Sequence, residues 1–220
     1  MKEYTIAELV MDFDIYPRSK VDTFHCNAMK QAIQSGAEFP PVVICKKTKR
    51  IVDGFHRCTA FKAIYGPSHK VQCVEKTYKS DANLFVDVMR FNASHGKSLS
   101  PCDKARCAII AERLHVPDDA VAGALHVSAE YLGELRVDKT ATAGGLHVPL
   151  KRTIQKQLAG RKLTDRQALA NTRLSGMNQQ FYVNQVIELI ESNLLDMEDD
   201  NLMEKIERLR TLLEGLAKNV

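Results

Sequence analysis

The stretch from Arg50 to Phe61 constrains the fold of this chain more than any other part of the sequence. It has the pattern of a buried strand that ends in a tight turn at Gly54 and leads directly into a helix. A helix that opens in this way presents unpaired backbone N–H groups and the positive end of its dipole. With His56 and Arg57 in its first turn, the segment predicts a phosphate site. The alternative is an ordinary strand-to-helix turn with two solvated basic residues.

Helix and strand patterns alternate over the first 98 residues of the chain. Apolar β-branched runs indicate strands, and amphipathic stretches bounded by glycine or proline indicate helices. We expect strands over residues 3–6, 41–46, 49–52 and 71–74, and helices over residues 25–34, 54–65 and 81–92. The second and third strands are close enough in sequence to form a hairpin.

Several of these segments carry short motifs in a characteristic order. In chain order they are Pro17-Arg18 with Phe24, a turn at Gly36, the strand Pro41-Val42-Val43, residues 53–57, and residues 90–96 around Asn92. A helix-turn-helix pattern follows them. This order resembles the ParB/sulfiredoxin superfamily, and the resemblance covers residues 1–136.

The resemblance implies an N-terminal domain that binds a nucleoside triphosphate, CTP or ATP, with or without Mg²⁺. The residues that match the phosphate- and nucleotide-binding positions are Arg18, Gly36, Asp53, Gly54, Phe55, His56, Arg57, Asn92, Ser94 and His95. Asp53 has three open roles: it can orient Arg57, position a metal-bound phosphate, or cap the helix. No separate metal site is expected.

The chain departs from the superfamily at informative positions. Sulfiredoxins have a nucleophilic cysteine directly before the His-Arg pair, where this chain has Phe55, so sulfinic-acid reductase chemistry is not expected. Cys58 lies one position past Arg57 and is interpreted as a packing residue. Partition-type ParB proteins have Gly-Glu-Arg-Arg at residues 54–57 and Gln-Arg after Asn92, and both pieces differ here.

The segment after Ser98 reads as entirely helical. Ser100 and Pro101 have the residue types of an N-cap and a first helical position, and we expect helices over residues 101–114, 118–125 and 129–136. The last two match a helix-turn-helix, with Ser128 as the N-cap of the recognition helix. Any small three-helix bundle would give a similar pattern.

Residues 141–145 read as a flexible connection, and basic helices are expected over residues 149–158 and 164–174. Basic residues at such spacing can follow a phosphate backbone, although a solvated basic face is the alternative. We expect duplex DNA to contact both this segment and the helix-turn-helix. The candidate DNA contacts are Ser128, Glu130, Tyr131, Arg136, Lys139, Lys151, Arg152, Lys156, Arg161 and Lys162.

Two further helical segments follow Gly176, separated by an acidic stretch at residues 196–200. The first has one apolar stripe, and the second repeats apolar residues at heptad-like spacing from Leu202 to Leu216. This pattern predicts a helical hairpin through which two copies of the chain form a homodimer. The alternative is that both stripes pack on the body of the same chain.

Charge is distributed unevenly along the 220 residues. Residues 1–98 carry 15 Lys and Arg against 10 Asp and Glu, residues 99–176 carry 12 against 8, and residues 177–220 carry 4 against 9.

The six cysteines form no Cys-x-x-Cys pair, so we expect free thiols and not metal ligands. No apolar run approaches the ~20 residues that span a bilayer. We expect a cytoplasmic, nucleoid-associated protein without a membrane partner.

The expected fold class is an α+β ParB/sulfiredoxin-like domain followed by an all-α helix-turn-helix region and a C-terminal helical hairpin. The expected divisions are residues 1–98, 99–140, 141–176 and 177–220.

The first functional hypothesis is a ParB-like DNA-binding protein in plasmid or mobile-element partition or in transcription regulation. The second is a nucleotide-dependent enzyme, either a kinase, a nucleotidase or a nuclease. The third is a nucleotide-free transcription regulator. No catalytic residue can be named, and enzyme activity would be at most slow triphosphate hydrolysis.

Overall fold

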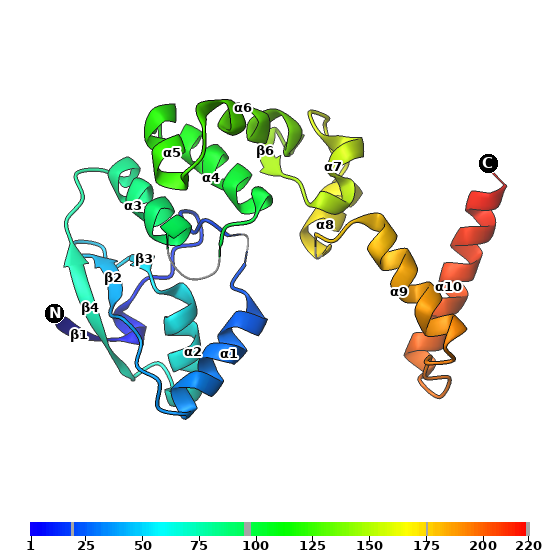
Figure 1. The fold of residues 1–220 in the computed structure, drawn as a ribbon, viewed down its shortest axis with the longest axis horizontal. Helices are drawn as coiled ribbons and strands as arrows, with labels where there is room; N and C mark the ends of the chain where they lie inside the picture. The colour runs from blue at the N-terminus through cyan, green and yellow to red at the C-terminus, as the bar shows by residue number, and fades with distance from the viewer. Residues whose placement is uncertain (19, 95–97, 175, 219–220) are drawn as a thin grey trace. The chain divides into compact units, whose positions relative to one another are not determined.

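The structure is a computed structural model that describes residues 1–18, 20–94, 98–174 and 176–218 (Figure 1). The chain forms two compact units, Met1–Gly176 and Met177–Val220. The first unit opens with four strands, a 3₁₀ turn and three helices. They are β1 (Lys2–Thr5), the 3₁₀ turn (Ile6–Glu8), α1 (Thr23–Gln34), β2 (Val42–Cys45), β3 (Ile51–Asp53), α2 (Phe55–Tyr65), β4 (Lys70–Lys76) and α3 (Asp81–Ser94).

The four strands form one sheet in the order β1-β4-β2-β3. Strands β2 and β4 run parallel, and the other two pairs are antiparallel. All four residues of β2 are buried, as expected for a strand that is covered on both faces. The hairpin expected from residues 41–52 is confirmed, with a register shift between Val43 and Ile44.

Alternation along β2 divides the apolar core into two layers. Val42 and Ile44 pack with Phe55 and Cys58 of α2, on the side of the sheet where α1 and α2 lie next to each other. Val43 and Cys45 belong to a second cluster, in which α3 contributes Leu84, Phe85, Val88 and Met89. That cluster continues into the helices that follow α3.

Three helices cover this second layer (Figure 1). They are α4 (Pro101–Arg113), α5 (Asp118–Leu125) and α6 (Ala129–Asp138). Ser100 caps α4 with Pro101 in the first helical position, as expected. Cys107, Val121 and Leu132 pack in the same cluster as the α3 residues, so residues 1–98 and 99–140 share one core. The expected fold class, an α+β domain followed by helices, is confirmed.

The expectation of a flexible connection at residues 141–145, with no strands after Ser100, was wrong. Residues on either side of Gly144-Gly145 pair as an antiparallel hairpin of β5 (Thr140–Ala143) and β6 (Leu146–Pro149). Both glycines have positive φ, 57° and 81°, as the tight two-residue turns of hairpins require. The strands are rich in alanine and threonine, so the apolar signal that normally identifies a strand is weak.

Two short helices complete the first unit, α7 (Arg152–Leu158) and α8 (Asp165–Arg173). They pack with the hairpin around a separate small core of Ala141, Leu150 and Leu163. Asn171 is buried and joins the two ends: its Oδ1 accepts from the Lys151 N–H at 2.8 Å, and its Nδ2 donates to the Pro149 carbonyl at 2.9 Å. We call residues 140–174 the hairpin module.

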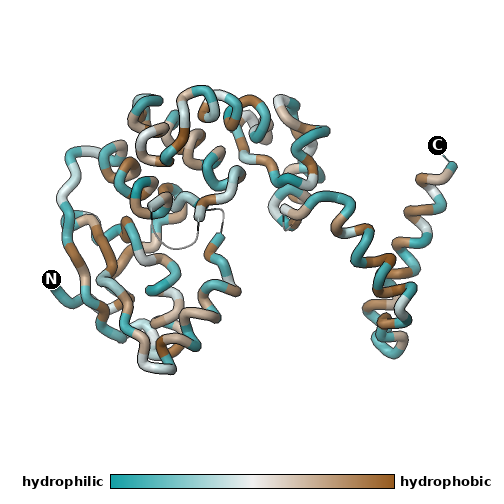
Figure 2. The backbone as a smooth tube through the Cα atoms, viewed as in Figure 1, coloured by the Kyte–Doolittle hydropathy of each residue, from teal (hydrophilic) through white to brown (hydrophobic). Residues whose placement is uncertain are grey.

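The second unit consists of α9 (Gln179–Glu191) and α10 (Asp200–Ala217). Asn178 and Asp199 cap the two helices through their side chains. Neither helix contains a buried residue, although apolar and polar residues alternate along both (Figure 2). Val183, Leu194, Leu213 and Leu216 are each more than half exposed.

Candidate functional site

A cavity of 170 Å³ lies at the start of α2. Its lining combines basic side chains, one carboxylate, one amide and two aromatic rings. The lining residues are Arg18, His25, Met29, Phe39, Pro40, Asp53, Gly54, Phe55, His56, Arg57 and Asn92. Seven of them were expected from the sequence, whereas His25, Met29, Phe39 and Pro40 were not.

The backbone at Gly54 allows the chain to turn from β3 into α2. Gly54 has φ +118°, and a Cβ atom there would lie 3.1 Å from both methyl groups of Val42 and 3.3 Å from Arg57 Nη2. Gly54 is the N-cap residue of α2 and has no side chain with which to cap the helix. The first turn of α2 therefore places the positive end of the helix dipole beside the cavity.

Arg57 is 6% exposed and is held by the protein itself. Its Nη1 donates to the carbonyls of Pro40 and Pro41, and its Nη2 pairs with Asp53 Oδ2 at 2.6 Å. Of the three roles open to Asp53, the structure shows the orientation of Arg57, and Asp53 does not cap α2. Arg57 thus fixes the loop before β2, and its nitrogens are largely occupied.

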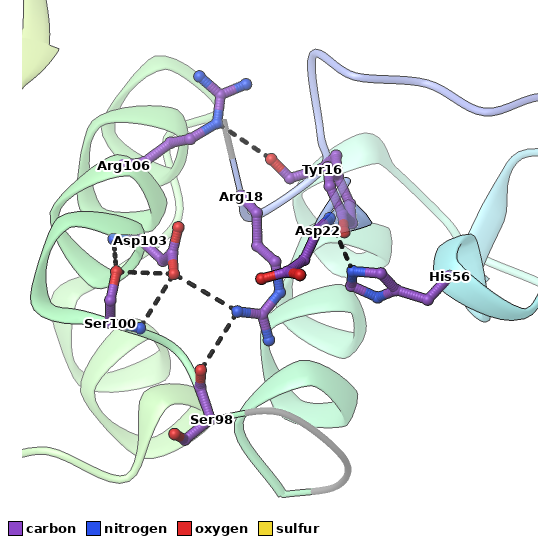
Figure 3. A network of polar contacts seen from close by, with 8 residues as sticks. All are labelled: Tyr16, Arg18, Asp22, His56, Ser98, Ser100, Asp103 and Arg106. Carbon is purple, nitrogen blue, oxygen red and sulfur yellow. Dashed lines mark hydrogen bonds and ion pairs between the residues drawn. The ribbon is translucent and has the colours of Figure 1, made fainter. Parts of the chain in front are cut away.

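A polar network connects the cavity to the start of α4 (Figure 3). The Asp22 N–H donates to His56 Nε2 at 3.2 Å, and the His25 ring lies edge-on to the His56 ring at 4.8 Å. Arg18 Nη1 donates to the Ser98 carbonyl at 3.2 Å and to Asp103 Oδ2 at 3.4 Å. The Asp103 carboxylate also accepts from Ser100 in the capping box of α4. Arg18 therefore spans the distance between the cavity and the helical region.

Three expected site residues do not line the cavity. Gly36 is exposed beyond the end of α1, with φ +84°. Ser94 is exposed, and its Oγ lies 3.1 Å from Nε2 of His126 in the turn between α5 and α6. His95 lies outside the described residues. Asn92 does line the cavity, but its Nδ2 donates to the Val88 carbonyl of its own helix at 2.8 Å.

Cys58 lies in the apolar core beneath α2, as the sequence suggested. It is fully buried, and burial raises the pKa of its thiol to about 12. A thiol with such a pKa is protonated at neutral pH and is a poor nucleophile. In the described part of the chain, no group of three or more His, Cys, Asp and Glu side chains is placed to hold a metal ion.

The helix-turn-helix is formed by α5 and α6, and His126 makes the turn with φ +53°. Ser128 caps α6 and accepts from the Tyr131 N–H at 3.1 Å. The exposed side of α6 carries Glu130, Glu134 and Asp138. Arg136, an expected DNA contact, forms a two-bond pair with Asp118 at 2.7 and 2.6 Å that joins α6 to α5.

Other arginines of the helical region are likewise held by the protein. Arg106 donates to the carbonyls of Tyr16 and Phe13, at 3.1 and 2.8 Å, and Arg113 donates to the Asp14 carbonyl at 2.9 Å. Residues 99–139 contain 5 Lys and Arg against 7 Asp and Glu, a net charge of −2. This region offers few cations to a polyanion.

The hairpin module has the opposite character. Residues 140–174 contain 7 Lys and Arg against one acid, Asp165, a net charge of +6. Six of the basic residues are exposed, and none of them forms an ion pair within the part of the chain that the structure describes. These six are Arg152, Lys156, Arg161, Lys162, Arg166 and Arg173.

Comparison with known proteins gives two curated relatives. The chain is 31% identical over 142 residues to the streptomycin biosynthesis operon possible regulatory protein of Streptomyces griseus. It is 28% identical over 130 residues to the transcriptional regulator NovG of Streptomyces niveus. These matches cover 60% and 58% of this chain but only 40% and 39% of the relatives. No family model matches the chain.

Three solved structures were also compared. A C-terminally truncated chromosome-partitioning protein ParB from Caulobacter crescentus, complexed to the centromeric parS site, is 14% identical with a TM-score of 0.44 over 93% of this chain and all of that chain. These structures are all ParB proteins. The same Caulobacter ParB complexed with CTP-γ-S is 16% identical with a TM-score of 0.37, over 61% of this chain and 75% of that one. A Pnob8-like ParB-N domain is 12% identical with a TM-score of 0.39, over 67% and 56%.

No helix in the described part of the chain is both long enough and apolar enough to cross a membrane.

Proposed function

We propose that this chain is a ParB-like DNA-binding regulatory protein that acts as a homodimer. The observation that carries the proposal is the set of exposed basic side chains on the hairpin module, directly after a helix-turn-helix, that form no ion pair within the described residues. Basic side chains without internal partners can neutralise phosphates and release counterions. The two curated relatives are named as regulatory proteins, which favours transcription regulation over partition. Nucleoid association would follow from DNA binding.

Binding of the full chain to duplex DNA tests this proposal. If about five of the six exposed cations contact phosphates, the affinity should fall with salt with a log–log slope of about −4 to −5. Fluorescence anisotropy of a labelled duplex of random sequence, titrated at several salt concentrations, measures the slope. No binding, or a slope near zero, would overturn the assignment.

We further propose that the cavity at the start of α2 binds the phosphates of a nucleoside triphosphate. The positive end of the α2 dipole, the ring of His25 and the ring of His56 support an anion at this place. The cavity of 170 Å³ is smaller than the roughly 300–1,000 Å³ of pockets that enclose whole ligands, so it suits the phosphate groups and leaves the base outside. One of the ParB structures is complexed with CTP-γ-S, which makes CTP the first nucleotide to test.

Nucleotide binding is tested with CTP, ATP and GTP, each with and without Mg²⁺, by calorimetry. Replacing His25 by Ala should weaken the preferred nucleotide about tenfold, the value of roughly one charge-assisted hydrogen bond. His69→Ala is the matched control, because His69 stacks on Tyr65 and Phe61 and is not among the residues that line the cavity. Equal affinity of both variants and the unmodified chain would remove the cavity from consideration.

The second unit supports the dimer. Its two helices leave apolar stripes exposed, and helices of 13 and 18 residues are marginal in water without a partner surface. A second copy of the same unit would cover both stripes, and would place two DNA-binding regions on one molecule.

A further inference from the structure

The hairpin module contains a third extended segment beside β5. The Thr142 N–H donates to the Arg161 carbonyl at 3.0 Å, and the Leu163 N–H donates to the Thr142 carbonyl at 2.8 Å. These two bonds make a parallel bridge between Thr142 and Lys162. The two-stranded sheet of β5 and β6 is therefore extended by one isolated bridge, so that β5 has β6 on one side and residues 161–163 on the other; we call this arrangement the small sheet.

The two faces of this small sheet differ. Ala141, Ala143, Val148 and Leu163 pack in the small apolar core together with α7 and α8. The residues between them in each strand point to the opposite face of the sheet, because successive side chains alternate across a strand. Thr142 pairs with His147 in β6 and with Lys162 across the bridge. The outer face therefore presents Thr142, His147 and Lys162 in one row, and the last two are exposed.

This row is fixed relative to the recognition helix. Strand β5 begins two residues after α6 ends, at Thr140. The Leu150 N–H donates to the Lys139 carbonyl at 2.7 Å, and the Thr140 hydroxyl donates to the Arg136 carbonyl of α6. Hydrogen bonds from Thr140 and from Leu150 thus attach the open end of the hairpin to the end of α6. A four-residue strand spans about 13 Å, close to the ~12 Å width of a major groove.

We propose that the outer face of the small sheet, Thr142, His147 and Lys162, is a second DNA contact that binds the phosphate backbone beside the groove entered by α6. The inference rests on the proposed DNA-binding function. A phosphate backbone fits this row because a cation, an imidazole and a hydroxyl can each bond a phosphate oxygen. Because the exposed side of α6 is acidic and gains little from phosphates, affinity for DNA requires a contact beside α6.

Footprinting of the full chain on its DNA tests the proposal. A binding site is first selected from a random duplex library, and hydroxyl-radical cleavage then maps the protected sugars. Lys162→Gln and His147→Ala should each remove protection at the edges of the footprint and leave its centre protected. Lys162→Gln should also lower the affinity about fivefold at 0.15 M salt and reduce the salt slope by about one unit. Lys47→Gln, which removes the same charge from the exposed β2–β3 turn, is the matched control.

The possible results separate the two proposals. If the unmodified chain does not bind DNA, the proposed function fails and this inference fails with it. If the unmodified chain binds and both variants give its footprint and slope, the inference alone is overturned. Equal losses in Lys162→Gln and Lys47→Gln would also overturn it, because the effect would then be one of net charge and not of the row.

Discussion

The helix-turn-helix region and the hairpin module lie next to each other in the sequence and use their basic residues differently. In residues 99–139, Arg106, Arg113 and Arg136 donate to carbonyls or carboxylates of the protein and connect helices to loops. In residues 140–174, six basic side chains extend into solvent without an ion-pair partner in the described chain. The first group therefore stabilises the fold, and the second is available to a ligand.

A recognition helix often supplies both affinity and specificity for DNA, and the difference between the two regions indicates that these two roles are divided here. Contacts to phosphates supply most of the affinity for DNA, whereas contacts to base edges supply the specificity. A helix with Glu130, Glu134 and Asp138 on its exposed side gains little from phosphates. Acidic side chains can still accept a hydrogen bond from the amino group of cytosine. We therefore propose that, in a DNA complex, α6 would supply the specificity and the hairpin module the affinity.

The largest effect is expected from removing charge in the module. Replacing Arg152, Lys156, Arg161 and Lys162 by Gln should reduce the salt slope by about 3–4 units and the affinity at 0.15 M salt by about 1,000-fold. The thermal midpoint should change little, because these side chains are exposed. Anisotropy and calorimetric unfolding measure the two quantities. An unchanged slope would place the affinity elsewhere in the chain.

Dimer formation should give the next largest effect, because a dimer presents both regions twice. Leu209 and Leu213 lie on the apolar stripe of α10, and Leu213 is 55% exposed. Replacing both by Asp should give a monomer, because unpaired carboxylates buried at such a seam would cost several kcal/mol. Binding to an inverted repeat should then fall at least 100-fold, towards the affinity for one half-site. Sedimentation of the unmodified chain as a monomer at ~10–100 μM, far above typical dimer dissociation constants, would contradict the dimer.

A smaller effect is expected for Arg106, which represents the structural group of arginines. Arg106→Gln leaves the carbonyls of Phe13 and Tyr16 without their donors. The free energy of unfolding should fall by about 1–3 kcal/mol, while the salt slope for DNA stays the same. Urea unfolding and anisotropy check the two parts. A reduced slope would show that Arg106 contacts DNA after all.

The smallest effect is expected for Arg136, although it was a candidate DNA contact. Its pair with Asp118 is well oriented but partly exposed, with 30% and 60% of the two side chains accessible. Arg136→Gln should therefore lower the free energy of unfolding by only about 0.2–1 kcal/mol. A large loss of DNA affinity in this variant would mean that DNA displaces Asp118 from the guanidinium.

Several parts of this molecule could be predicted from the sequence because they depend on local signals. Ser100, Pro101 and Ser128 identify helix starts through capping chemistry, and the apolar run of β2 reflects burial on both faces. The Gly54 turn identified the cavity, although not its full lining. His25, Phe39 and Pro40 reach it through the packing of distant segments, which no local pattern reports.

Other features were beyond local signals. The hairpin of residues 140–149 was missed because alanine and threonine strands lack an apolar pattern, although the Gly-Gly turn was a usable sign. Arg57 and Arg136 were predicted as ligand contacts from their positions in the first turn of α2 and in the recognition helix. Their partners, Pro40, Pro41 and Asp118, became visible only with the tertiary structure, and it is these partners that decide whether an arginine is available.

The central claim is that the hairpin module supplies the affinity for DNA. Lysine acylation tests it most directly, with the full chain labelled with and without DNA and the products read by mass spectrometry. The reagent labels each exposed ammonium group at a rate that bound DNA reduces. We predict that DNA slows labelling at Lys156 and Lys162 of the hairpin module, and leaves the rates at Lys47 and at Lys104 of α4 nearly unchanged. Protection at Lys104 with none at Lys156 and Lys162 would contradict the assignment of affinity to the module.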